Sequence, residues 1–252
     1  MPKSNWSALT HELTCWRAEG MRLPIWWRDD DAIAPTPELD RLTRMAGDLY
    51  LPVHLAVIPE PATSALASYC AGAEMLIPLV HGWRHKNHAP ESAKKAEFAH
   101  PRSGIEGELK AALARMKTLF SANMVPVFVP PWNRLDPSIM EKVALEGYRG
   151  VSTFTPRTSK FAAAGLVQIN THLDPINWRG GGGLVAEDVL IDRLVTLLRD
   201  RREGRTDLEE PLGLLTHHLV HDAAIWDFTR TCLSRLLDGG AVAVDLRLGP
   251  LP

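Results

Sequence analysis

Two histidines, His81 and His85, stand four residues apart directly after the apolar run 75–80. On a helix this spacing places both rings on one face, and in a tight loop the rings can also converge. Imidazole nitrogens are common ligands of zinc-like ions, so the pair could supply two ligands of a metal site. An ordinary pair of surface or hydrogen-bonded histidines is the alternative, and a third ligand elsewhere in the chain would favour the metal site.

The candidate third ligand belongs to a run of three acids, Asp29, Asp30 and Asp31, which follows the apolar segment 23–27. Neighbouring carboxylates repel one another, so a bound cation or a role in proton transfer would explain the run better than stability does. The segment 23–28 has the composition of a strand, and α/β proteins place their sites at the carboxyl ends of strands. A solvated acidic turn that caps the next helix is the alternative.

Three more motifs follow in the chain: Phe-Val-Pro-Pro-Trp-Asn at 128–133, Asp-Pro-Ile-Asn-Trp at 174–178, and Leu-Thr-His at 215–217. With the acid run and the His-x-x-x-His motif, this order resembles the polysaccharide deacetylases with NodB homology, a group of family 4 carbohydrate esterases. The resemblance extends over nearly the whole chain. It implies an irregular (β/α) barrel with about seven strands and a metal-dependent hydrolase, with each motif at the carboxyl end of a strand.

The resemblance also implies a metal-ligand set and a base. Asp31, His81 and His85 would hold one divalent ion, with zinc as the first choice, and would leave a position open for water. Asp30 would be the general base, since the family uses the first acid of an adjacent pair as base and the second as ligand. A register shifted by one residue would instead make Asp29 the base and Asp30 the ligand.

The general acid implied by the resemblance is His217, in the Leu-x-His motif. His218 is the competing candidate for this role. Asp174 would orient the acid imidazole or a neighbouring one, because a carboxylate on one ring nitrogen fixes the tautomer. The substrate-binding residues implied by the motifs are Pro131 and Trp132, which would form the groove, and Trp178, which would wall the acyl pocket.

Two departures from the family pattern affect the expected chemistry. The family has an arginine, paired with the catalytic acid, where this chain has Val129. Arg28, Arg84 or Arg134 could replace it. The second acid of the family's tryptophan motif is Asn177 here, and a neutral amide cannot stabilise a cation as a carboxylate does.

Composition restricts the class of protein and its partners. The 252 residues are 45% hydrophobic and 23% charged, with a formal net charge of −2, so there is no electrostatic case for nucleic acid or an anionic membrane as a partner. Three scattered cysteines, no signal-like segment and no membrane-length apolar run predict a cytoplasmic protein. We expect one catalytic domain over 1–252, and the sequence leaves the oligomeric state open.

Strand-like and helix-like segments alternate along the chain, which predicts a parallel α/β fold that is either a barrel or an open doubly wound sheet. The predicted strands are 23–28, 51–58, 75–80, 125–129, 150–154, 166–170, 212–217 and 241–246. The predicted helices are 6–19, 37–49, about 61–71, 104–120, 137–147, 185–202 and 223–237.

The function expected from these observations is metal-dependent removal of an acyl group from an N-acylated sugar or related compound, as a small molecule or an oligosaccharide. An amidase acting on a small non-sugar C–N bond is one alternative. A carbohydrate-binding protein that has kept the fold and lost turnover is another. Retention of the five residues with implied metal and proton-transfer roles argues against such a loss, whereas the missing family arginine argues for it.

Overall fold

The computed structural model describes residues 5–252, and within them the strands form one nine-stranded sheet. Its order is β6-β7-β5-β4-β3-β2-β1-β8, with β9 paired to the beginning of β1. The strands are β1 (Leu23–Ala32), β2 (Val53–Val57), β3 (Leu76–His81), β4 (Val127–Val129), β5 (Gly150–Val151), β6 (Phe161–Ala163), β7 (Leu166–Gln168), β8 (Leu212–Thr216) and β9 (Ala241–Ala243).

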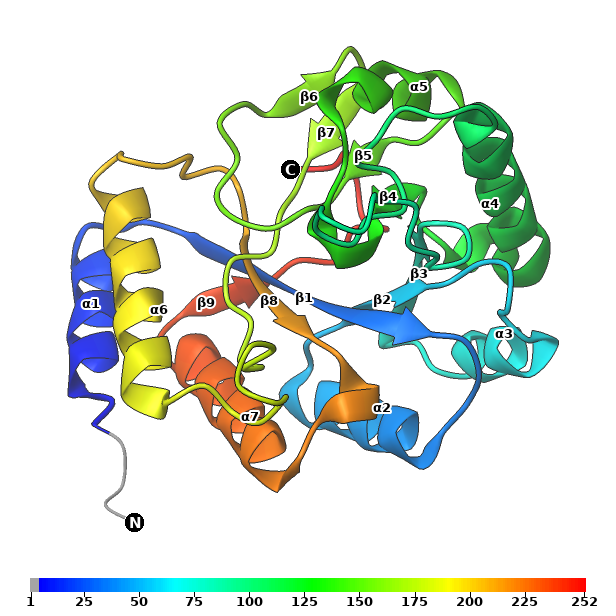
Figure 1. Ribbon diagram of the computed structural model, residues 1–252. Helices are drawn as coiled ribbons and strands as arrows, with labels where there is room; N and C mark the ends of the chain where they lie inside the picture. Colours follow the sequence, from blue (N-terminus) through cyan, green and yellow to red (C-terminus); the bar gives the residue numbers. More distant parts are fainter. Residues whose placement is uncertain (1–4) are drawn as a thin grey trace.

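All paired strands are parallel except β6 and β7, which confirms the predicted α/β architecture (Figure 1). No ladder among the described residues joins the edge strands β6 and β8, so the barrel is irregular and incompletely closed. The segment after β7 partly closes it through a bridge between Leu173 and Leu214. Gly213 permits this approach, because a Cβ there would lie 2.6 Å from the carbonyl oxygen of Asn170.

The alternation of side chains along the strands separates two apolar cores. On β1, Ile25 and Trp27 belong to the larger core between the sheet and the helices, whereas Trp26 belongs to a smaller core inside the barrel. Leu246 and Leu251, from the segment after β9, pack into the smaller core. The interior of the barrel is therefore filled with side chains below the level of the acid run.

Helices cover the outside of the sheet (Figure 1). They are α1 (Ser7–Ala18), α2 (Pro37–Leu49), α3 (Ser64–Ala71), α4 (Ile105–Phe120), α5 (Met140–Leu145), α6 (Glu187–Arg202) and α7 (Ala223–Asp238). The short 3-10 turns are η1 (Ser121–Asn123), η2 (Pro131–Asn133), η3 (Pro137–Ile139) and η4 (His218–Val220). Thr36 begins α2 as expected, since its hydroxyl accepts a hydrogen bond from Leu39 N at 3.1 Å and Pro37 follows it. None of the described helices combines the length and apolar character needed to cross a membrane.

Several elements differ from the sequence prediction. β1 continues through the acid run to Ala32, and β5 is only two residues long. The predicted helix 137–147 is split into η3 and α5. β6 was not predicted, because its residues pair only with β7 at the edge of the sheet and Phe161 is exposed.

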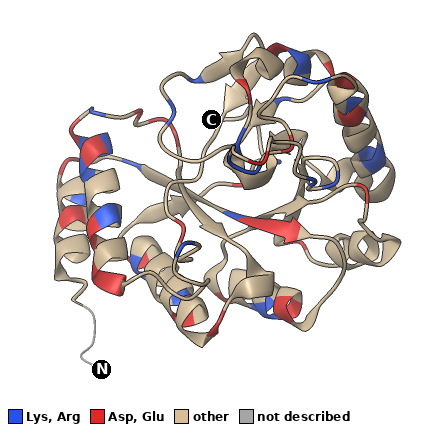
Figure 2. Ribbon diagram, in the orientation of Figure 1, with Lys and Arg blue, Asp and Glu red and all other residues tan. Residues whose placement is uncertain are grey.

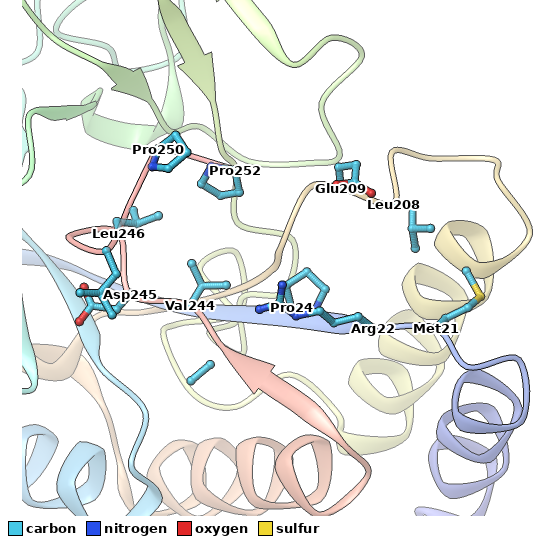
Figure 3. A pocket seen from close by; sticks show the side chains of 12 residues that line it. Met21, Arg22, Pro24, Leu208, Glu209, Val244, Asp245, Leu246, Pro250 and Pro252 are labelled. Carbon is cyan, nitrogen blue, oxygen red and sulfur yellow. The ribbon is translucent and has the colours of Figure 1, made fainter.

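A cleft of about 470 Å³ opens at the amino end of β1, where the segment after β9 passes the loop before β8 (Figure 3). Pro24, Leu246 and Leu248 line it, together with the charged side chains of Glu209 and Asp245. The acid run lies at the other end of the same strand. In α/β barrels the amino ends of the strands serve stability rather than catalysis, and the candidate site lies away from this cleft.

Candidate active site

The three acids at the end of β1 point in different directions. Asp29 pairs in register with Leu55 and Ala32 with Val57, so β1 carries an extra residue between these pairs and forms a bulge. Asp31 lies in the bulge with a φ of 76°, a left-handed conformation that is uncommon for any residue with a side chain. Figure 2 shows the tip of β1 in the red of acidic residues.

Asp31, His81 and His85 converge at the carboxyl ends of β1 and β3. Asp31 Oδ1 lies 3.0 Å from His81 Nε2 and 3.3 Å from His85 Nε2. One donor atom from each residue lies within 4.8 Å of the others, which is close enough for all three to bind one ion. The side chains of Asp31 and His85 are 32% and 24% exposed, so the cluster is open to solvent on one side. Two nitrogens, one oxygen and an open side fit the ligand set of a catalytic zinc ion.

The loop that carries His85 is held by contacts beneath the cluster. His81 Nδ1 donates to the carbonyl of Val129 at 3.0 Å, which leaves Nε2 as the free ligand atom. The buried carboxylate of Glu97 accepts hydrogen bonds from the backbone amides of residues 83 and 84 at 3.1 and 2.8 Å. Gly82 has a φ of 58°, and a Cβ there would lie 2.2 Å from Glu97 Oε2. Glu97 therefore requires the glycine and fixes the loop.

Burial and neighbouring charges shift the pKa values of the three cluster residues in different directions. Burial opposes ionisation of Asp31, but the hydrogen bond and charge of His81 lower the pKa of this carboxyl well below its usual range. Burial by itself would lower the pKa of His81, but Asp30 and Asp31 outweigh it and raise that pKa. Burial and the neighbouring His81 lower the pKa of His85, so the ring more readily stays neutral, as a metal ligand must.

Asp30 faces the barrel interior and is held by Arg28, two residues earlier on the same face of β1. Arg28 Nε and Nη2 each lie 2.9 Å from one oxygen of Asp30, and both side chains are buried. The guanidinium also donates to Ser152 Oγ at 2.7 Å and to Asn133 Oδ1 at 2.5 Å. Arg28 thus forms the ion pair with Asp30 that the resemblance assigned to an arginine at the position of Val129.

The other two arginines considered for this role have different partners. Arg84 Nε lies 3.6 Å from Glu60, and Arg134 donates to the carbonyl of Lys95 at 2.5 Å. Neither is paired with Asp30.

His217 lies directly after β8, with its ring edge-on to Trp178 at a centroid distance of 4.8 Å. Its charge also acts on Asp31 and Asp174, where it favours the ionised carboxylates by lowering their pKa. Asp174 accepts hydrogen bonds from Ile176 N at 2.9 Å and Trp178 Nε1 at 2.8 Å. No hydrogen bond among the described residues joins Asp174 to His217, so the contacts of Asp174 orient Trp178 rather than the imidazole.

Burial raises the pKa of Asp174, although His217 acts in the opposite direction. A carboxyl so placed accepts a proton more readily than a free one. The indole of Trp178 is 53% exposed and therefore available to a ligand.

His218, the competing candidate for the acid, faces away from the cluster. Its Nδ1 lies 2.5 Å from Asp29 Oδ1, and both side chains are buried. Asp29 and His218 thus form a separate ion pair on the helix-facing side of β1.

The two motif residues Pro131 and Trp132 lie in η2, beside the metal cluster. Trp132 has a φ of 57°, and its ring packs on His85 at a centroid distance of 4.3 Å. Pro131 is buried beneath Gly82. The side-chain oxygen of Asn177 accepts a hydrogen bond from Gly180 N at 3.0 Å within the glycine-rich turn.

Sequence reasoning missed three contributors to this arrangement. Glu97 carries no local motif, and its role depends on a loop fold that spans 82–97. Ser152 and Thr216 make contacts across strands, which a linear pattern does not reveal. The sequence left Arg28, Arg84 and Arg134 open as partners of Asp30. The two-residue spacing of Arg28 and Asp30 is a signal that could have distinguished Arg28, because residues two apart on a strand share a face.

Comparisons with known proteins identify the fold. No family model and no curated protein matches the sequence. The structure is similar to a Mycobacterium smegmatis protein assigned as a polysaccharide deacetylase, with a TM-score of 0.62, 13% identity and coverage of 88% of this chain and 86% of that one. It is similar to a family 4 acetyl xylan esterase from Clostridium thermocellum in complex with cobalt (TM-score 0.53, 10% identity, 88% and 87% covered). It is also similar to a family 4 pseudoenzyme from Bacillus anthracis (TM-score 0.54, 13% identity, 88% and 63% covered).

These likenesses confirm the predicted fold, that of the polysaccharide deacetylases and family 4 carbohydrate esterases. The same fold is shared by a pseudoenzyme, so the fold by itself does not establish an activity.

Proposed function

We propose that this protein is a metal-dependent hydrolase that removes an acyl group from an N-acylated sugar or a related amide. The observation that carries the proposal is the convergence of Asp31, His81 and His85 next to an acid that is already paired with a buried arginine. Structural similarity to polysaccharide deacetylases and to a cobalt-bound acetyl xylan esterase supports the reaction class and the metal.

Asp31, His81 and His85 would hold the ion. When bound, a divalent ion of this kind polarises a carbonyl and makes water more acidic. The ligand atoms of the two histidines face Asp31 Oδ1. The open side of the cluster would let the scissile carbonyl reach an ion held by these residues.

Asp30 is the base in this proposal. Arg28 contacts both of its oxygens from one side, which fixes the carboxylate and compensates its charge. A carboxylate has more lone pairs than these two hydrogen bonds use, so Asp30 keeps the capacity to accept a proton from the attacking water. Because Arg28 has no exposed surface, the ion pair is shielded from competing water.

His217 is the acid in this proposal, and it protonates the leaving amine. Trp178 packs against the imidazole and is itself held by Asp174, so the two rings form one wall of the site. Trp132 forms another wall, against His85. The exposed face of Trp178 offers a stacking surface of the kind that binds the apolar face of a sugar ring.

Release of acetate or formate from a panel of N-acyl compounds tests the proposal. The panel includes N-acetylated oligosaccharides, N-acetylated monosaccharides and small non-sugar amides, each assayed with the zinc-loaded and the chelator-treated protein. Release from the sugars that depends on zinc is the expected result. Release from the non-sugar amides alone would replace the proposal with a small-molecule amidase.

Failure to release acid from any compound, with zinc bound and sugar binding intact, would identify a carbohydrate-binding protein without turnover. The pseudoenzyme with this fold makes that outcome a real alternative. Full activity after complete removal of metal would refute the metal-dependent mechanism.

A further inference from the structure

Asp29 is the one acid of the run that the proposed chemistry does not use, and it is buried with no exposed surface. Its Oδ2 accepts hydrogen bonds from Thr216 Oγ1 at 2.6 Å and from the backbone amide of His218 at 3.0 Å. Its Oδ1 contacts His218 Nδ1 at 2.5 Å. A single carboxylate therefore binds the residues immediately before and immediately after His217.

These contacts lie on the opposite side of the sheet from the metal cluster. Neighbouring residues of an extended chain point to opposite faces, so fixing the residues at 216 and 218 on the helix-facing side directs His217 into the barrel. The backbone amide of His217 donates to His221 Nε2 at 3.3 Å, which fixes the same segment from a third direction. Burial lowers the pKa of His221 to about 4, so its ring stays neutral and can accept this hydrogen bond.

We propose that Asp29, Thr216, His218 and His221 form a clamp that positions His217 for proton donation to the leaving group. No hydrogen bond or ion pair in the described residues joins the side chains of the clamp to Asp31, His81 or His85, so they act through the backbone of His217. That these four residues position an acid rests on the function proposed above, whereas the hydrogen bonds of the clamp are a property of the fold.

The clamp also explains why the chain has two adjacent histidines after β8. The one side-chain hydrogen bond of His218 within the described residues goes to Asp29, and its buried Nε2 has no partner there. The His218 ring therefore compensates the negative charge of Asp29 and does not face a substrate. His217 has the exposed neighbour Trp178 and the nearby charge of Asp31.

The test compares Asp29→Asn with wild type on an amide substrate and on an activated ester with the same acyl group. An activated leaving group needs little protonation, so the ester depends weakly on the acid. We expect kcat for the amide to fall by about a hundredfold, as for a misplaced catalytic group, with smaller changes in KM and in ester turnover. Adding Asp29→Asn to His217→Ala should cause little further loss, because the clamp acts through His217.

Glu210→Gln is the matched control. Glu210 is likewise a buried carboxylate in contact with an imidazole, that of His172, at 3.1 Å, and it accepts hydrogen bonds from the backbone amides of residues 157 and 170. Its loss should lower stability while the ratio of amide to ester turnover stays that of wild type. Zinc content is measured for every variant, and Asp29→Asn should retain it.

Equal losses on amide and ester in Asp29→Asn, or full additivity with His217→Ala, would overturn the positioning role. If the wild type hydrolyses no substrate, the proposed function fails, and amide hydrogen exchange then tests the clamp alone. Asp29→Ala should expose the amides of His217 and His218 to exchange while the amides of β3 remain protected. Unchanged protection of these two amides would overturn the clamp itself.

Discussion

Replacing Arg28 with methionine should destabilise the protein far more than the loss of an ordinary arginine. Arg28 is fully buried and contacts both oxygens of Asp30 at 2.9 Å, with further hydrogen bonds to Ser152 and Asn133. Methionine fills a similar volume, so the stability lost in Arg28→Met reports the charge and the hydrogen bonds of Arg28 rather than its packing. The variant leaves the carboxylate of Asp30 buried without its partner.

The expected loss follows from that unpaired charge. Removing one partner of a buried ion pair costs about 3–5 kcal/mol in the free energy of unfolding. Urea denaturation of the metal-free protein measures it without the stabilising effect of a bound ion. Arg230→Met is the matched control, because Arg230 pairs with Asp48 at 2.9 Å but the two side chains are 47% and 59% exposed. Exposed pairs contribute about 0–1 kcal/mol.

A second substitution tests the cause of the loss. Adding Asp30→Asn to Arg28→Met removes the uncompensated charge and should recover part of the stability. A loss in Arg28→Met no larger than that in Arg230→Met, or no recovery in the double variant, would refute the reasoning. Either result would mean that Arg28 is not needed to compensate the buried negative charge of Asp30.

Three further predictions concern the ligands, the base and acid stability. Replacing His81 or His85 with alanine should lower zinc content well below one ion per chain in elemental analysis, and an unchanged content would contradict their assignment as ligands. Asp30→Asn should keep the ion and lose turnover by about 10²–10⁴-fold, while Asp31→Asn should lose the ion; the reverse would shift the assignment by one residue. Burial lowers the pKa of His172 from 6.5 to about 4. The unfolded chain therefore binds the extra proton first, and the free energy of unfolding should fall by about 3 kcal/mol from this group as pH drops from 6.5 to 4. His172→Asn should flatten that dependence in urea denaturation at several pH values, and an unchanged slope would show that His172 titrates alike in both states.

The sequence alone was enough to predict the alternating fold and the end of the barrel at which the candidate site residues gather. The apolar runs before the acids and before His81 form β1 and β3, which are joined through β2 in one parallel sheet. Carboxyl ends of parallel strands meet at one edge, so residues far apart in the sequence were expected to gather there. The candidate ligand residues do gather, with Asp31 and His81 fifty positions apart in the chain and in contact.

The direction of each acid could not be predicted, because it depends on the bulge in β1. An unbroken strand would turn Asp29 and Asp31 to the same face and would separate both from Asp30. The register shift against β2 changes that relation only at Asp31. Such a shift is set by the pairing of two strands and by the left-handed φ of Asp31, and neither has a local sequence signature.

The bulge also explains how three adjacent carboxylates are compatible with a stable strand. Asp29 faces outward to the imidazole of His218, and Asp30 faces inward to Arg28. Asp31 leaves the strand direction and meets His81 at the end of β3 and His85 in the loop that follows it. Each negative charge therefore has its own nearby partner: His218 for Asp29, Arg28 for Asp30, and the two histidines for Asp31. These short-range attractions offset the repulsion between the neighbouring carboxylates. The same run connects the proposed outer clamp, the proposed interior base and the proposed metal ligand through consecutive peptide bonds, so a displacement of β1 by one residue would disrupt all three together.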